Sequence, residues 1–188
     1  MTTLHLPTDA TEPAGHVPAG EARVWDPLVR ILHWSLVAAV AVAFVTGDES
    51  ERIHVYAGYA ALAIVGLRLV WGVVGTRHAR FADFVRGPRA VLAHLRDMVR
   101  LRPGRHLGHN PAAGAMVVAL LVAILMTGLS GWIALGPGAL AHAAEDVHEA
   151  FANLLLGLVI LHVLGVAVSS VLERQNLVRA MWAGRKRL

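Results

Sequence analysis

The 188-residue sequence contains no cysteine. The chain therefore forms no disulfide, holds no thiolate-bound iron–sulfur cluster and attaches no haem covalently, because c-type attachment needs Cys-x-x-Cys-His. Charge is also scarce, since 16 % of the residues are Asp, Glu, Lys or Arg, whereas an average soluble domain has about a quarter. Any redox centre in this chain is thus held by nitrogen or oxygen ligands, and a lipid-facing surface is predicted.

Apolar residues make up 56 % of the sequence and gather in four long runs. A helix needs about 20 such residues to cross a bilayer. The predicted transmembrane helices cover residues 28–46, 53–74, 112–135 and 147–172. Asp26-Pro27 and Asn110-Pro111 are each typical of an N-cap followed by proline at the first helical position. One such run is also compatible with a buried core helix, but four together predict an all-α, four-helix transmembrane bundle.

The segments outside these runs predict a tail and two surface helices. Residues 1–24 contain three prolines and no apolar core, which is unlike a signal peptide. We predict a disordered cytoplasmic tail over residues 1–24 and a single membrane domain over residues 25–188. Residues 88–101 and 177–182 have amphipathic patterns that indicate short helices in the membrane interface, and a solvated surface helix is the alternative for each.

The charged residues predict the orientation. Arginines crowd the connection between the second and third runs, and Lys and Arg follow the fourth run, whereas the other two connections are acidic. Because positive loops stay inside, both termini are expected in the cytoplasm of a bacterium, with the protein in the inner membrane. The net charge of +4 comes from these loops, which we expect to attract anionic lipid and not nucleic acid.

Four histidines fall inside the predicted helices or at their ends: His33, His54, His148 and His162. Ionisable side chains are costly inside a bilayer, so each of them indicates a functional role. His148 and His162 share one face of a helix and are separated by about 21 Å along its axis. One metal ion cannot contact both, whereas two centres, one near each membrane surface, can.

The depth of each histidine predicts how the four pair. The first helix runs outward with His33 near its start, and the second runs inward with His54 at its outer end. His33 is therefore expected to face His162. His54 is expected to face His148. Two imidazoles from different helices hold a haem edge-on in a bundle, so we predict two haem b groups with these four histidines as iron ligands, and no catalytic residue.

Three further residues are candidates for haem binding. Gly58 follows His54 by one turn and leaves room for a porphyrin, although close helix packing explains a glycine equally well. Arg68 lies fourteen residues after His54, on the same helix face. Arg30 lies one turn before His33. Both arginines are candidate partners for anionic haem propionates, and snorkelling to the interface is the alternative.

Several short motifs follow one another along residues 23–188. They are Arg30-x-x-His33-Trp34, His54-x-x-x-Gly58, Arg68-Leu-Val-Trp71-Gly72, Gly108-His109-Asn110-Pro111, His148-Glu149 with His162, Asn176-Leu177-Val178 with Met181, and Gly184-Arg185-Lys186-Arg187. Together they resemble the prokaryotic cytochrome b-561 family, in the superfamily of the b-type subunits of nickel–iron hydrogenases and formate dehydrogenases.

The resemblance implies two b haems on the paired histidines, and electron exchange between a quinone and a partner on the outer side. That partner is expected to be a cytochrome c or a dehydrogenase or hydrogenase subunit, and the acidic outer connections favour a basic cytochrome c. The chain would act as, or within, a quinone-linked oxidoreductase. Candidate quinone contacts are Tyr56, Tyr59 and Trp132, or Arg68 and Trp71.

Other functions stay open at this point. A superoxide-oxidising quinone reductase and a cytochrome b anchor subunit of a hydrogenase or dehydrogenase complex are alternatives within the same superfamily. A purely structural membrane anchor would bind no haem. A metal transporter would place its histidines at one depth along a polar path, whereas these lie at two depths in apolar helices.

Overall fold

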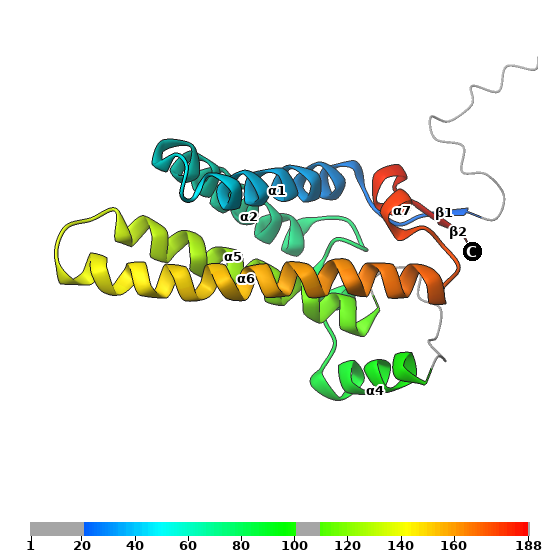
Figure 1. Ribbon diagram of the computed structural model, residues 1–188. Coiled ribbons are helices and arrows are strands. Elements are labelled where there is room, and N and C mark those ends of the chain that lie inside the picture. The colour runs from blue at the N-terminus through cyan, green and yellow to red at the C-terminus, as the bar shows by residue number, and fades with distance from the viewer. Residues whose placement is uncertain (1–20, 101–109, 188) are drawn as a thin grey trace, which may run out of the picture.

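The computed structural model describes residues 21–100 and 110–187, which are mainly helical (Figure 1). In chain order the elements are β1 (Glu21–Arg23), α1 (Pro27–Thr46), α2 (Glu51–Val74), α3 (Phe81–Phe84), α4 (Pro88–Val99), α5 (Pro111–Ala134), α6 (Ala139–Leu172), α7 (Leu177–Ala183) and β2 (Arg185–Arg187). The helices α1, α2, α5 and α6 are long and apolar enough to cross a membrane, which confirms the predicted four-helix bundle.

These four helices turn apolar side chains outward. Each contains an 18-residue window with a mean hydropathy of at least 1.8, yet no more than 28 % of any such window is buried. A water-soluble bundle would bury these faces, because large exposed apolar surfaces are unfavourable in water. The exterior of the bundle is therefore suited to lipid, and the chain is a multi-pass membrane protein.

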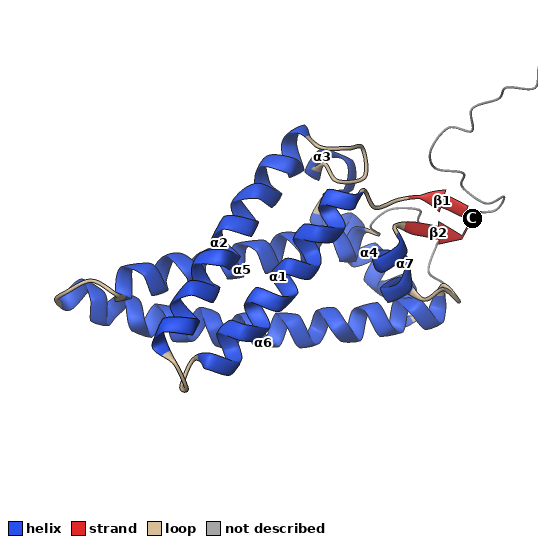
Figure 2. Ribbon diagram, turned by 90° about the horizontal axis from the view of Figure 1, so that it is seen from above, coloured by secondary structure: helices blue, strands red, loops and turns tan. Residues whose placement is uncertain are grey.

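The long helices form two antiparallel pairs, α1 with α2 and α5 with α6. Figure 2 shows that the α1–α2 pair crosses the α5–α6 pair obliquely. The pairs meet where α2 packs against α5, around the fully buried Val65. Gly128 of α5 permits this approach, since a Cβ there would lie 2.5 Å from the Leu62 side chain. Small residues of this kind let membrane helices come close together.

The two ends of the bundle differ in charge. The α1–α2 and α5–α6 connections lie at one end, on the left of Figure 1, which we call the acidic end. Its acidic residues are Asp48, Glu49, Glu51, Glu145, Asp146 and Glu149. The short helices and both strands lie at the other, which we call the basic end. Its cationic residues include Arg77, Arg80, Arg86, Arg89, Arg96, Arg100, Arg174, Arg179, Arg185 and Lys186.

The structure differs from the sequence-based expectation at the start of α6 and at the ends of the chain. α6 begins at Ala139 and not at residue 147, because the apolar run marks only the lipid span while the alanine-rich residues before it continue the helix. The β1–β2 pair was not predicted. It places Glu21–Arg23, in the expected tail, beside Arg185–Arg187. The rest of that tail lies outside the described residues.

Local signals explain the other borders. Asp26 and Asn110 accept hydrogen bonds from the backbone of the first turns of α1 and α5, as predicted. The short α3 was not expected. The amphipathic segments form α4 and α7, and α7 ends at Gly184 in the left-handed conformation, with a φ of 79°. The Gly184 carbonyl then accepts hydrogen bonds from the N–H groups of Val24 and Trp25, which starts the strand pairing.

Candidate functional site

The acidic end holds a pair of imidazoles from different helices. His54, in the first turn of α2, and His148 of α6 have ring centroids 5.8 Å apart and planes at 80°. The structure therefore brings together the two histidines that were predicted to lie at the same depth in the membrane. Nδ1 of His54 lies 2.9 Å from the Ala43 carbonyl oxygen of α1. Nδ1 of His148 lies 2.8 Å from the Thr127 carbonyl oxygen of α5.

These hydrogen bonds define the state of both rings. A carbonyl oxygen only accepts, so Nδ1 carries the proton and donates in each case. In the neutral ring Nε2 then keeps its lone pair, which is the form of imidazole that binds a metal. The bond to a carbonyl also orients the ring and makes the ligand nitrogen more basic. Both imidazoles at the acidic end are therefore arranged to bind a metal through Nε2.

A glycine lies one helical turn after each of the accepting carbonyls. At Gly131 of α5, an added Cβ would lie 2.7 Å from His148 Nδ1, which is too close for non-bonded atoms. At Gly47, after α1, an added Cβ would lie 3.8 Å from His54 Nδ1, which is an ordinary contact. Gly131 is therefore needed for His148 to reach α5, whereas the position of Gly47 tolerates a larger residue.

The basic end holds the second pair. His33 of α1 and His162 of α6 have ring centroids 6.5 Å apart and planes at 61°. Within the described part of the chain, neither ring makes a hydrogen bond. Indole rings lie beside His33 instead: Trp34 is edge-on to His33 with ring centroids 5.2 Å apart, and Trp182 of α7 lies 5.6 Å from Trp34. The short helix α7 therefore packs against α1 next to His33.

Both pairs have the spacing of two ligands on opposite sides of one metal ion. Because a bond from an imidazole nitrogen to a metal is about 2 Å long, two such rings have centroids about 6 Å apart. Among the described residues, no group of three or more His, Cys, Asp or Glu could hold a metal ion. The histidines thus lie as pairs, and two imidazoles are the protein ligands that a bis-histidine haem iron would take.

The helices also leave space for a flat group beside the histidines. α6 packs along α5 but has no extended contact with α1 or α2. An added Cβ at Gly58 of α2, or at Gly157 or Gly165 of α6, would meet nothing within 4 Å. The donor set fits a haem iron, and these glycines leave the backbone of α2 and α6 uncovered where a flat macrocycle could approach it.

Two buried donors lie beside the basic-end pair. Arg30, one turn before His33, donates from Nη2 to the Trp182 carbonyl. Its Nε, like Nε1 of Trp34, is buried and has no hydrogen-bond partner within the described residues. Unpaired buried donors are unfavourable. An acceptor that belongs to a bound group, such as a carboxylate, would satisfy them.

Arg68 of α2 is 8 % exposed and contacts the segment after α2. Its Nη2 donates to the Ala79 carbonyl at 3.1 Å, and its guanidinium carbon lies 5.0 Å from the centre of the Phe81 ring. Its Nη1 is buried without a partner among the described residues. Arg68 therefore anchors the connection that leads to α3 and keeps one nitrogen for an acidic group. Its role toward a haem propionate stays a prediction.

Asp26 joins the start of α1 to the end of α2 at the basic end. Its Oδ1 accepts from the Val29 N–H at 2.9 Å, and its Oδ2 accepts from Trp71 Nε1 at 3.2 Å and Thr76 Oγ1 at 2.5 Å. Burial alone raises the pKa of this carboxyl, but the hydrogen bonds from Thr76, Val29 and Trp71 outweigh it and hold the pKa below its usual 3.8. The indole N–H of Trp71 is thereby used in holding the helices together.

The other candidate quinone contacts lie at the acidic end. Tyr59 of α2 and Trp132 of α5 line one open pocket together with Ile133, Leu135 and Gly136. Tyr56 lies on the surface, with 68 % of its area exposed. His109, in the Gly108-His109-Asn110-Pro111 motif, lies outside the described residues.

The roles of three residues in these sites were missed from the sequence. Gly131 had no signal of its own, although it stands four residues after Thr127, whose carbonyl His148 binds. Trp34 was noted only as part of the Arg30-x-x-His33-Trp34 motif, and Trp182 only as part of the amphipathic segment 177–182. Their contact depends on how α7 folds back onto α1, which no local pattern indicates.

The comparisons with known proteins agree with this architecture. Residues 24–184 match the model of the family described as prokaryotic cytochrome b561. The chain belongs to this family. It is similar to a probable Ni/Fe-hydrogenase B-type cytochrome subunit of Cupriavidus necator, with 25 % identity over 211 aligned residues that cover 86 % of this chain and 85 % of the relative. No solved structure matches the chain significantly.

Membership confirms the resemblance that the motifs indicated. A b-type cytochrome binds haem b and transports electrons, so the family implies haem b as the cofactor of this membrane protein. The two imidazole pairs are consistent with that cofactor.

Proposed function

We propose that this cytochrome binds two haem b groups and carries electrons across the bacterial inner membrane, between a periplasmic redox partner and the quinone pool. The observation that supports the proposal most directly is the presence of two separate imidazole pairs in one bundle. The members on α6, His148 and His162, are about 21 Å apart along the helix axis. Two sites stacked in this way provide a path between the ends of the bundle.

The proposed residues divide into iron ligands, partners for the propionates and a residue that leaves space for the porphyrin. Haem b, when bound, supplies a one-electron couple at its iron. His33 and His162 would hold one group. His54 and His148 would hold the other, and with two imidazoles for each iron no coordination position stays open for oxygen. The unpaired nitrogens of Arg30 and Arg68 offer donors to propionates, and Gly58 leaves space along α2.

The distribution of charge supports an orientation with the basic end and both termini in the cytoplasm. The absence of cysteine makes a direct test simple. We expect Asp48→Cys to react with a membrane-impermeant maleimide added to intact spheroplasts, and Arg77→Cys to react only after the membrane is permeabilised. The reverse pattern would overturn the orientation without affecting the proposed haem ligands.

The acidic end is suited to a basic redox partner such as a cytochrome c, because complementary charge speeds encounter and sets orientation. The same surface repels anions, which disfavours the alternative of a superoxide-oxidising quinone reductase. A second candidate function is supported by the relative from Cupriavidus necator, which is named as a hydrogenase subunit. In that case the partner is a hydrogenase or dehydrogenase subunit, and the present chain is its membrane-anchored cytochrome b.

Electron transfer by the purified protein in proteoliposomes tests the path. A quinol analogue should reduce the α-band of the wild-type protein, and a basic cytochrome c added outside should then be reduced at a rate that falls with salt. In His54→Ala, quinol reduction should persist while reduction of cytochrome c stops. Equal rates of cytochrome c reduction by His54→Ala and wild type would contradict the path. Co-purification of a hydrogenase or dehydrogenase subunit would favour the second candidate.

A further inference from the structure

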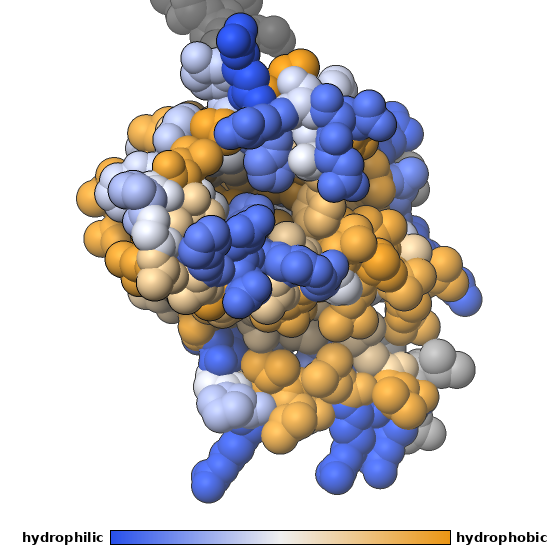
Figure 3. Space-filling view, turned by 60° about the vertical axis from the view of Figure 1, so that its left-hand side comes forward, coloured by the Kyte–Doolittle hydropathy of each residue, from blue (hydrophilic) through white to orange (hydrophobic). Residues whose placement is uncertain are grey.

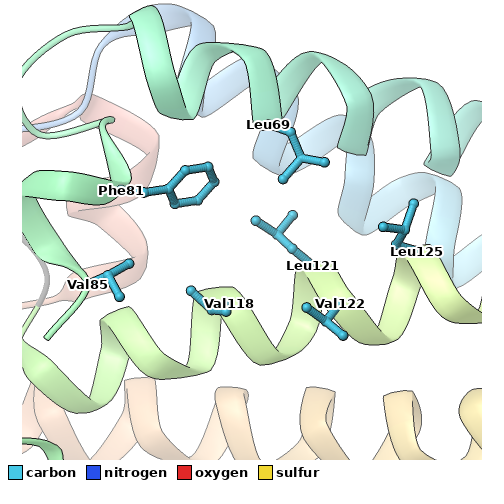
Figure 4. Close-up of a pocket in the computed structure, with 7 residues that line it drawn as sticks. All are labelled: Leu69, Phe81, Val85, Val118, Leu121, Val122 and Leu125. Carbon is cyan, nitrogen blue, oxygen red and sulfur yellow. The ribbon is translucent and has the colours of Figure 1, made fainter. Parts of the chain in front are cut away.

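An apolar groove runs along the outside of the bundle between α2 and α5, far from the imidazole pairs in sequence and lined by different residues. Its walls are formed by Leu69 of α2, Phe81 and Val85 of the α3 segment, and Val118, Val122 and Leu125 of α5 (Figure 4). The lining presents no polar surface, and the cavity measures about 280 Å³. That chemistry and size are suited to a hydrocarbon chain, because a polar ring would find no hydrogen-bond partner there.

The groove opens to the surface of the molecule. Val85, Leu69 and Val122 are 43 %, 39 % and 51 % exposed, respectively. The bundle exterior faces lipid, so the group that has access to this opening is a lipid chain.

The orientation of α4 indicates where the headgroups lie. On this helix the buried side chain is polar, namely His94 at 7 % exposure, whereas Leu92, Leu95 and Val99 are exposed. A helix that packs in water does the reverse. The lower part of Figure 3, where α4 projects from the bundle, shows hydrophobic side chains on the surface beside hydrophilic ones. The apolar side of α4 is therefore suited to the boundary between acyl chains and headgroups.

Two exposed arginines closely follow the groove residue Val85 in the chain. Arg86 follows the groove residue Val85, and Arg89 lies in the first turn of α4; both are exposed. Arg86 donates to the Asp83 carbonyl oxygen at 3.1 Å, which leaves its charge uncompensated by that contact. The Asp83 carboxylate pairs with Arg80 at 3.0 Å instead. The mouth of the groove thus carries positive charge.

We propose that this site binds one anionic phospholipid of the leaflet at the basic end. One acyl chain lies in the groove between α2 and α5, and the phosphate lies between Arg86 and Arg89. The all-apolar lining accounts for the chain, and charge complementarity accounts for the headgroup. The bound lipid would thus contact α2, the α3 segment and α5 along the groove.

Lipid retention in nanodiscs made of equal parts phosphatidylglycerol and phosphatidylcholine tests the proposal. After release into detergent, native mass spectrometry counts the lipids that stay bound to each chain. The wild type should retain phosphatidylglycerol in preference to phosphatidylcholine. Neutralising Arg86 and Arg89 together, as Arg86→Gln with Arg89→Gln, should weaken retention of phosphatidylglycerol by about fivefold for each arginine. The matched control, Arg174→Gln with Arg179→Gln, removes the same charge elsewhere at the basic end and should retain the lipid.

A second pair of variants tests the groove itself. Val122→Trp fills the cavity and should abolish retention, whereas Val163→Trp makes the same change at an exposed position of α6 and should not. Circular dichroism and a monodisperse elution profile verify that each variant is folded. Equal retention of both phospholipids by the wild type, or undiminished retention by Val122→Trp, would overturn the proposal. A quinone found in place of the phospholipid would overturn it as well.

Discussion

The two imidazole pairs of this cytochrome use the same ligand type but are held in different ways. At the acidic end, His54 and His148 are fixed by backbone carbonyls of α1 and α5, so all four long helices take part. At the basic end, the indole of Trp34 lies edge-on to His33 and contacts Trp182, and the half-buried Arg30 lies one turn away. The first environment orients the imidazoles and makes them more basic, whereas the second places a cation beside them.

For the two haem sites that we propose, this difference predicts different midpoint potentials. More basic ligands favour the oxidised state of an iron, and a nearby cation favours the reduced state. We therefore expect the basic-end site to have the higher potential.

Removal of a ligand has the largest expected effect and tests whether the pairs are independent. In His148→Ala the acidic-end site loses a ligand while His33 and His162 stay intact, so the haem content should fall from two per chain to one. His142→Ala, in the same helix, should keep two. The pyridine haemochrome assay against protein concentration measures both. Equal loss from both sites in a protein of normal helicity would contradict the depth pairing.

Gly131→Ala should weaken the acidic-end site alone. The new Cβ would lie 2.7 Å from His148 Nδ1, so the ring must leave its place. An off-rotamer side chain costs about 1 kcal/mol, which corresponds to roughly fivefold weaker haem retention at that site. Retention is measured as haem loss to apomyoglobin. The matched control Gly66→Ala adds a methyl group in open space, and a similar loss from that variant would show that the effect is not specific.

Arg30→Gln should affect the basic-end site alone. Loss of the cation disfavours the reduced state, so the higher of the two midpoint potentials should fall by about 60 mV, the equivalent of a tenfold change in a one-electron equilibrium. Arg30→Lys keeps the charge and should restore most of the potential. A redox titration followed at the α-band measures both midpoints. A shift confined to the lower midpoint would reverse our assignment of the two sites.

Asp26→Asn has the smallest expected effect, because it changes only the hydrogen bonds that join the start of α1 to the end of α2. The variant keeps an N-cap but loses a charged acceptor for Trp71 and Thr76, and unfolding in detergent should become easier by about 1 kcal/mol. Since the pKa of Asp26 is lowered in the folded state, its contribution is complete above pH 3.8 and is lost as the pH falls through the folded value.

The difference between the thermal unfolding midpoints of Asp26→Asn and wild type should therefore be largest near pH 7 and should shrink below pH 3.8. Asp83→Asn, which removes only the exposed pair with Arg80, should change the midpoint little at either pH. A difference that grows toward low pH would contradict the assigned role of the carboxylate.

The sequence was sufficient to predict the depth of each histidine in the membrane but not the rotation of each helix about its own axis. Rise per residue and the alternating direction of the helices placed His33 opposite His162 and His54 opposite His148. In the structure the ring centroids of these two pairs lie 6.5 and 5.8 Å apart, respectively. Gly131 was missed because α5 is apolar on all sides, so its sequence does not show which side meets α6. That rotation is decided by packing between helices.

Contacts between distant segments were equally hard to predict. Asp26 was identified as an N-cap, but its bonds to Trp71 and Thr76 span 45 and 50 residues and depend on how α1 meets α2. The β1–β2 pair joins Glu21–Arg23 to the basic segment Arg185–Arg187, neither of which has a strand pattern, and it forms because the turn at Gly184 brings them together. Local signals of the kind found at Asp26 report helix borders and not tertiary partners.

The central claim is that two imidazole pairs hold two haem groups in one chain. Its most direct test is the haem stoichiometry of the protein purified after expression with ample haem, by pyridine extraction and amino-acid analysis. The account predicts two haem b groups per chain. A value of one in the wild-type protein, or a colourless polypeptide, would contradict it.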